Sequence, residues 1–245
     1  MRARLVAVTA LIAALSGSAL YGSALPASAQ APAKPDAKPA AAPAVAAALP
    51  NKWDGPEFVI GNPNAKVTLV EYASAACPHC ARFDAQVFPQ LKAKYIDTGK
   101  VKYAFREMLV GDEGEVNIAA ISFMMARCAG HDKYMDVVEQ VFRAQPEIFQ
   151  TQDVKAVFVR IAKANGLSEA QLDACLNDKS AVDQLNARVE QAEKVDKVDS
   201  TPTLIANGKK LQQKPGQEWD FATLDAQLKP LVSGAAPARK PTRHH

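Results

Sequence analysis

Two cysteines separated by two residues are the strongest chemical signal in this sequence. The motif Cys77-Pro78-His79-Cys80 follows an apolar, strand-like run over residues 67–72 and precedes a helical pattern. We therefore expect Cys77 at a helix N-terminus, where unpaired backbone N–H groups and the positive end of the helix dipole stabilise a thiolate. Because the thiolate is the species that exchanges disulfides, the motif predicts thiol–disulfide chemistry.

The two residues between the cysteines favour the same chemistry. Pro78 presets the backbone for a first helical turn, where its missing N–H costs nothing. His79, as a histidine, has one donor and one acceptor ring nitrogen and stands where it can donate a hydrogen bond or a positive charge to a Cys77 thiolate. Such stabilisation favours the reduced form and makes the disulfide a stronger oxidant. The alternative for His79 is a solvated loop histidine without this role.

Two other uses of the cysteine pair are less consistent with the sequence. A four-ligand zinc site needs two more Cys or His ligands nearby, and neither Cys128 nor Cys175 has such a neighbour at ligand spacing. A purely structural disulfide between Cys77 and Cys80 would close a loop too small to restrain the unfolded chain much. The sequence therefore favours a redox pair and predicts neither a metal site nor a dissociable cofactor.

The first residues have the pattern of an export signal. A positively charged start and an apolar core over residues 5–15 lead to an Ala-Ser-Ala cleavage pattern at residues 27–29. Residues 1–29 are thus predicted to be a signal peptide of bacterial type, with an uncleaved membrane anchor as the alternative. Export indicates the periplasm, an oxidising compartment in which disulfides persist. Cleavage removes two arginines and no acid, so the formal charge falls from +3 to +1 and indicates no nucleic-acid partner.

Composition divides the remaining chain into a linker, one folded domain and a tail. Residues 30–52 are dominated by Ala and Pro, which predicts an extended linker. Residues 232–245 are small, basic and Pro-containing, which predicts a disordered tail ending in His244-His245. The folded part is then residues 53–231, enough for one domain with a sizeable core.

Hydrophobic periodicity within that domain predicts an α/β fold with an all-helical insertion over about residues 112–195. Before and after the insertion, the pattern predicts strands at residues 58–60, 67–72, 101–106 and 203–206, and helices at residues 80–95 and 218–228. Pro89 should kink the first of these helices, and Asn207-Gly208 should form a hairpin turn. Within the insertion, we expect helices at residues 115–128, 133–144, 154–164, 168–176 and 181–195. Ser168 and Gln171 fit a capping box.

The segment over residues 69–80 resembles the active-site segment of the DsbA family of thioredoxin-fold thiol:disulfide oxidoreductases. Thr201-Pro202-Thr203, ahead of a strand, resembles the cis-proline loop of that family, and the helical block is similar to its helical insertion. The resemblance covers about residues 56–231. It implies a thioredoxin fold, with a central mixed sheet flanked by helices and an all-helical insertion.

The resemblance also implies roles for individual residues. Cys77 would be the exposed nucleophile that forms the mixed disulfide, and Cys80 the buried resolving cysteine. Glu71 matches an acidic residue under the active site that accepts or relays the Cys80 proton, against the alternative of a surface residue at a strand end. Pro202, if cis, would pack beside the disulfide, and the backbone of Thr201 would pair with an incoming peptide. A trans-proline at a strand start is the alternative.

The remaining cysteines, Cys128 and Cys175, both fall in the helical block. In an oxidising compartment they most simply pair as a structural disulfide. Two free, buried thiols are the alternative.

A dithiol oxidase of the periplasm is the function that the resemblance implies. Its clients would be unfolded or reduced exported proteins, and a quinone-linked, DsbB-like membrane protein would reoxidise it. Ser200 stands where related loops often have Gly, and Thr201 differs from the Val of the best-known oxidases, which leaves a disulfide isomerase or reductase as the alternative. The linker has no strand or heptad pattern for oligomerisation, so we expect a monomer. A metal-binding or chaperone module that uses Cys77 and Cys80 as ligands is the alternative from another class.

Overall fold

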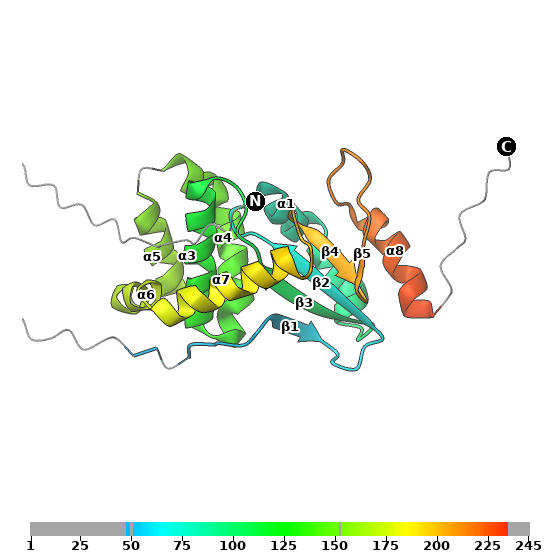
Figure 1. The fold of residues 1–245 in the computed structure, drawn as a ribbon, viewed down its shortest axis with the longest axis horizontal. Coiled ribbons are helices and arrows are strands. Elements are labelled where there is room, and N and C mark those ends of the chain that lie inside the picture. Colours follow the sequence, from blue (N-terminus) through cyan, green and yellow to red (C-terminus); the bar gives the residue numbers. More distant parts are fainter. Residues whose placement is uncertain (1–47, 50, 152, 235–245) are drawn as a thin grey trace, which may run out of the picture.

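A computed structural model of the chain describes residues 48–49, 51–151 and 153–234 (Figure 1). The predicted signal peptide, most of the predicted linker and most of the predicted tail, including His244-His245, lie outside the described residues. Within the described ranges, no helix is long and apolar enough to span a membrane.

A five-stranded mixed sheet forms the centre of the molecule, as predicted (Figure 1). Its strands are β1 (Phe58–Gly61), β2 (Val67–Ala73), β3 (Val101–Glu107), β4 (Thr203–Ala206) and β5 (Lys209–Lys210). Their order across the sheet is β1-β3-β2-β4-β5. The central pair β2 and β3 is parallel, and the other neighbouring pairs are antiparallel. The strand that leads into the Cys-x-x-Cys motif, β2, therefore lies in the middle of the sheet.

The predicted Asn207-Gly208 turn joins β4 to β5 and helps to place β4 beside β2. Both residues have positive φ, 48° and 77°, as the tight turns of two-residue hairpins require. The Asn207 side chain accepts a hydrogen bond of 2.8 Å from the backbone N–H of Thr68 in β2. This contact ties the hairpin to the central strand and holds the start of β4, next to Pro202, at the end of β2 that precedes the motif.

The helical segment after the motif differs from the single kinked helix expected over residues 80–95. It consists of α1 (Pro78–Gln86), α2 (Phe88–Leu91) and a π-helical turn, η1 (Lys92–Ile96). Pro89 has no N–H to donate to the preceding turn, and its ring crowds that turn, so the helix is interrupted rather than bent. The break limits α1, which Cys77 precedes and which contains Cys80, to nine residues.

The insertion between β3 and β4 is entirely helical in the described residues. Its helices are α3 (Glu113–Ala129), the short 3-10 helix η2 (His131–Lys133), α4 (Tyr134–Gln150), α5 (Val154–Ala164), α6 (Glu169–Leu176) and α7 (Lys179–Lys194). The Ser168–Gln171 capping box is present at the start of α6. Helices α3 to α6 gather at one side of the sheet, and α7 runs back across it toward β4 (Figure 1). Helix α4 continues past its predicted end at residue 144 and contains Pro146.

A buried ion cluster joins the insertion to the sheet at Glu107, the last residue of β3. Its carboxylate accepts hydrogen bonds from Arg127 of α3 (2.6 Å), Tyr134 of α4 (2.9 Å) and Arg188 of α7 (2.6 Å). Arg127 also donates to the backbone carbonyl of Gly55 at 2.7 Å. One buried carboxylate thus holds three insertion helices against the sheet. Removing Glu107 would leave the buried guanidinium of Arg127 without its carboxylate partner, which is strongly destabilising.

The last helix, α8 (Phe221–Ser233), begins later than predicted. Asp220 caps it, since its carboxylate accepts the backbone N–H of Thr223 at 2.7 Å. The expected start at residue 218 is therefore wrong, and Glu218 and Trp219 belong to the loop that precedes α8. Through Glu218, this loop contacts His79 and Arg82 of α1.

Cys128 of α3 and Cys175 of α6 form a disulfide across 47 residues of sequence, and both are buried. We expect the double variant Cys128→Ala/Cys175→Ala to lose about 3 to 4 kcal/mol of unfolding free energy, because a loop of this length no longer restrains the unfolded chain. Urea denaturation of the oxidised proteins measures the loss. Equal midpoints for the variant and the parent protein would show that the bond contributes nothing to stability.

Candidate active site

Cys77 is the N-cap residue of α1, as the sequence predicts. Its backbone is extended, with φ −79° and ψ 120°, and Pro78 occupies the first helical position. The Cys77 carbonyl accepts the N–H of Ala81 at 3.1 Å, the first bond of the helix. The backbone N–H groups of His79 and Cys80, in the first turn of α1, are therefore within reach of the Cys77 sulfur.

Burial differs from the expectation for one of the two cysteines. Cys80 is fully buried, but Cys77 is only 9% exposed rather than freely accessible. The loop before β4 covers it, since the carbonyl oxygen of Thr201 lies 3.6 Å from the Cys77 sulfur, within reach of a thiol S–H donor. A reacting partner therefore has to approach Cys77 beside this loop.

The two sulfurs have opposite acidities. A hydrogen bond from the Cys80 thiol lowers the pKa of Cys77 to about 5, helped by the Thr201 hydroxyl and by the backbone N–H groups of Cys80 and His79, although burial opposes the shift. Burial raises the pKa of the Cys80 thiol well above its usual range, and the neighbouring Cys77 raises it further. At neutral pH the negative charge therefore resides on Cys77.

The loop before β4 contains a cis peptide bond between Thr201 and Pro202. The Thr203 hydroxyl donates to the carbonyl of Ser200 at 2.7 Å and closes the turn. The Thr201 hydroxyl is buried and has no other hydrogen-bond partner in the described part of the chain, so it is available to a thiolate at Cys77. The loop thus places both the carbonyl and the hydroxyl of Thr201 beside the Cys77 sulfur.

Glu71 lies in β2 and is 2% exposed, so it is a buried residue and not a surface residue at a strand end. The hydroxyl of Tyr103 in β3 donates to its carboxyl oxygen Oε2 at 2.7 Å. Burial raises the pKa of Glu71 to about 8, and the negative charge of Asp84 adds to the rise, while the Tyr103 hydrogen bond opposes it. The charge of Glu71 in turn raises the pKa of Cys80, so the two groups interact.

The imidazole of His79 is paired with a carboxylate rather than with Cys77. Its Nδ1 lies 2.7 Å from Oε1 of Glu218, in the loop before α8. Arg82 donates to the same oxygen at 2.6 Å through Nη2, which also lies 2.9 Å from His79 Nδ1. Burial acts to raise the pKa of Glu218, but the hydrogen bonds from Arg82 and His79 outweigh it and hold that pKa below its usual value. The Glu218 carboxylate therefore offsets the positive charge of Arg82 on the exposed side of α1.

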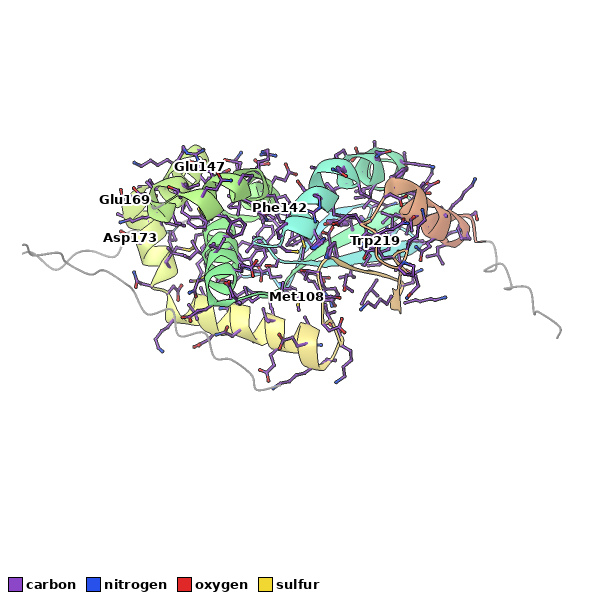
Figure 2. The ribbon with its side chains drawn as sticks, turned by 90° about the horizontal axis from the view of Figure 1, so that it is seen from above. Met108, Phe142, Glu147, Glu169, Asp173 and Trp219 are labelled. Carbon is purple, nitrogen blue, oxygen red and sulfur yellow. A yellow bond between two sulfur atoms is a disulfide. The ribbon has the colours of Figure 1, made fainter. Side chains whose placement is uncertain are left out.

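We expect Glu218→Gln to lower the pKa of Cys77 by a few tenths of a unit, because His79 and Arg82 would lose their anionic partner beside the thiolate. Titration of the thiolate ultraviolet absorbance in the reduced protein measures the shift. Glu147→Gln is the matched control: Glu147 is also an exposed carboxylate paired with an arginine, Arg160, and it lies on the insertion, far from Trp219 and the α8 loop (Figure 2). A rise in the Cys77 pKa would contradict this reading of Glu218.

Four residues of the site were not predicted from the sequence: Tyr103, Arg82, Glu218 and Gln145. Gln145 of α4 donates through Nε2 to the backbone carbonyls of Ala75 and Cys77. A signal for it existed, since it is a polar residue at the buried position of an otherwise apolar helix face. No local pattern indicates the other three, because Tyr103 contacts Glu71 from a neighbouring strand and Arg82 contacts Glu218 in the distant loop before α8.

The arrangement can perform thiol–disulfide exchange. A nucleophilic sulfur with a lowered pKa sits beside a buried sulfur with a raised pKa, and a buried carboxyl group lies next to the latter. Among the described residues, no group of three or more His, Cys, Asp or Glu side chains is placed to hold a metal ion.

Comparisons with known proteins identify similar chains. A family model described as thioredoxin matches residues 54–226. The "Putative protein-disulfide oxidoreductase" of Rickettsia bellii is 30% identical over 158 residues, which are 64% of this chain and 59% of that relative. "Disulfide bond formation protein D" of Bacillus subtilis is 25% identical, over 70% of this chain and 77% of that relative. The crystal structure of Wolbachia pipientis alpha-DsbA1 is 26% identical with a TM-score of 0.61, covering 73% of this chain and 92% of that chain.

Proposed function

This chain belongs to the DsbA family of thioredoxin-fold proteins, and from that premise we propose that it is a thiol–disulfide oxidoreductase that introduces disulfides into exported proteins. One observation carries the proposal: Cys77, with a pKa lowered to about 5, caps α1 beside the buried Cys80. The chain spans 59% of the length of the Rickettsia relative, so the activity is inferred from this site rather than from the name of that protein.

The reaction we propose transfers one disulfide in two exchange steps. A client thiolate attacks the Cys77 sulfur of the Cys77–Cys80 disulfide, the bond between the two cysteines breaks, and Cys80 leaves as a thiolate that takes up a proton. A second client thiolate then attacks the client sulfur of the mixed disulfide, and Cys77 leaves as a thiolate. The client loses two electrons and gains a disulfide, and the protein becomes the dithiol.

The acidities of the two sulfurs favour this direction. A stable Cys77 thiolate is a good leaving group in the second step, and stabilising the reduced form makes the disulfide more oxidising. Cys80, whose pKa is raised, binds a proton at neutral pH after it leaves. Glu71 is the adjacent buried group able to supply or collect that proton, because its pKa of about 8 lies near neutral pH.

The setting of this reaction is part of the proposal. The signal pattern of residues 1–29 supports an exported, periplasmic protein whose clients are unfolded or reduced exported proteins. The reduced Cys77–Cys80 pair needs an oxidant, for which we propose a quinone-linked, DsbB-like membrane protein. We propose a monomer, since the linker over residues 30–52 has no pattern for assembly.

A disulfide isomerase or reductase on the same scaffold is the second candidate. Ser200 stands where related loops often have Gly, Thr201 stands before the cis-proline where the best-known oxidases have Val, and Thr201 contacts the Cys77 sulfur directly. Compared with Val, Thr201 adds a hydroxyl beside the Cys77 sulfur, which changes the relative stability of the thiolate and the disulfide. That relative stability distinguishes an oxidase from an isomerase or a reductase.

Equilibration of the Cys77–Cys80 pair with glutathione buffers, on residues 30–245, tests the proposal. A reduction potential well above about −200 mV identifies a disulfide donor, and reactivation of a scrambled client then separates oxidase from isomerase. A potential near −270 mV, roughly that of thioredoxin, would make the protein a reductant and overturn the oxidase assignment. Stoichiometric zinc or copper that is lost when both cysteines are replaced would instead support a metal-binding module.

A further inference from the structure

Gln145 is a polar residue on the buried face of α4, in the helical insertion. The positions before and after it on that face are apolar, among them Val138, Val141 and Ile148, and Gln145 itself is 4% exposed. Phe142, three residues earlier, lies where the insertion meets α1 (Figure 2). A glutamine at such a position is unfavourable unless its amide is hydrogen-bonded.

The amide of Gln145 serves the loop that leads from β2 into α1. Its Nε2 donates to the carbonyl of Ala75 at 2.9 Å and to that of Cys77 at 3.2 Å. Ala75 is fully buried, and within the described residues this is the one hydrogen bond found for its carbonyl. The Cys77 carbonyl also accepts the N–H of Ala81, so the Gln145 bond is made to the residue that caps the helix.

The loop held in this way determines where the Cys77 sulfur points. The N–H of Cys77 donates to the carbonyl of Ser74 at 3.0 Å, and Gln145 bonds two carbonyls of that turn, those of Ala75 and Cys77. A change of a few tenths of an ångström in this turn would move the sulfur relative to the N–H groups of α1 that stabilise its negative charge. The side chains of Ala75 and Ala76 have no polar group to replace the Gln145 amide.

We infer that Gln145 is a positioning residue, through which the helical insertion holds the loop over residues 74–77 (the redox loop) and sets the stability of the Cys77 thiolate. The inference rests on the proposed function, because it concerns the same cysteine pair. It gives the insertion a role in the chemistry in addition to packing. Gln145 touches neither sulfur nor client, so it acts through the backbone of Cys77 and is not a catalytic residue.

The test compares Gln145→Met with Gln140→Met in the full-length protein. Methionine keeps the length and volume of glutamine but removes both donors. Gln140 is the matched control, since it lies on the same helix and its amide donates to Asn165 at 3.2 Å, away from the redox loop. We expect Gln145→Met to raise the pKa of Cys77 by about one unit and to shift the equilibrium with glutathione about tenfold toward the disulfide. Gln140→Met should change neither.

A purely structural role would give a different result. If both variants lose similar unfolding free energy and their thiolate titrations match that of the parent protein, the inference is wrong. Should Gln145→Met not fold, the parent protein still decides: the NMR signals of the Gln145 side-chain amide should titrate with the Cys77 thiolate, and those of Gln140 should not. A Gln145 signal that is constant through that titration also overturns the inference.

These readouts separate the inference from the proposed function. If the parent protein fails to oxidise a reduced client, but Gln145→Met still raises the pKa of Cys77 relative to the parent, the oxidase assignment is wrong and the positioning role of Gln145 is supported. If the parent protein oxidises the client, but the Cys77 pKa is the same in Gln145→Met and Gln140→Met, the oxidase assignment is supported and the positioning role is wrong.

Discussion

Replacing Cys77 with alanine is expected to reduce oxidation of a reduced client to the rate without protein, because no disulfide remains to be attacked. Replacing Cys80 with alanine should also stop turnover, because Cys77 alone cannot form the disulfide that a client thiolate attacks. Offered an oxidised client instead, the lone Cys77 thiolate should attack a client disulfide, release one client thiolate and stay trapped as a mixed disulfide, since no Cys80 thiol is left to displace the client. Client oxidation, followed by thiol titration and non-reducing electrophoresis, measures both effects. The double variant Cys128→Ala/Cys175→Ala should keep its activity at a temperature where it is folded.

The pH dependence of Cys77 reactivity is a second readout of the same site. The folded-state pKa of Cys77, about 5, lies below the ordinary value of 9.0, so the reduced protein gains stability from this group as pH rises from about 5 to 9. The gain is fully present above the ordinary pKa and is lost as pH falls through 5. Alkylation of Cys77 should therefore half-saturate near pH 5. Half-saturation near pH 9 would contradict the thiolate on which the proposed function depends.

Glu71→Gln is expected to stabilise the protein at alkaline pH. The folded-state pKa of Glu71, about 8, lies above its ordinary value of 4.5. Ionisation of Glu71 therefore does not reduce the unfolding free energy below pH 4.5, and it reduces that free energy progressively as pH rises from 4.5 to about 8. Above pH 8 the variant should exceed the parent protein by about 5 kcal/mol in unfolding free energy, from 1.36 kcal/mol per pKa unit. The Tyr103 hydroxyl can still donate to the amide oxygen, so the packing is preserved.

Denaturation of both proteins at several pH values from about 4 to 9 tests this expectation. Glu193→Gln, on the exposed surface of α7, is the matched control and should show no such pH-dependent gain. A difference between Glu71→Gln and the parent protein that does not change with pH would show that Glu71 is not the protonated group inferred from its burial. Glu71→Gln should also slow each exchange step that moves the Cys80 proton, because an amide cannot carry it.

Short-range features of the chain were predictable from the sequence. The strand before the cysteines, the placement of Cys77 at a helix start, the Ser168–Gln171 capping box and the Asn207-Gly208 turn depend on residues a few positions apart. Their geometry follows from local dihedral preferences and from local hydrogen bonds, which residue types largely determine. The end of α1 at Gln86, shortly before Pro89, was only partly predictable, because a proline predicts a disturbance of the helix but not whether the helix bends or breaks.

What the sequence by itself determined is therefore the redox motif, the order of strands and helices, and the family to which they belong. Tertiary structure alone decided the surroundings that set the chemistry: the burial of Cys77, the Tyr103 hydroxyl on Glu71, the Glu218 carboxylate on His79 and the Gln145 amide on the redox loop. These contacts join residues from 32 to 139 positions apart. No periodicity or spacing encodes such a pair, because the partner of a buried polar group is chosen by how separate elements pack, and a pKa depends on that partner and on burial.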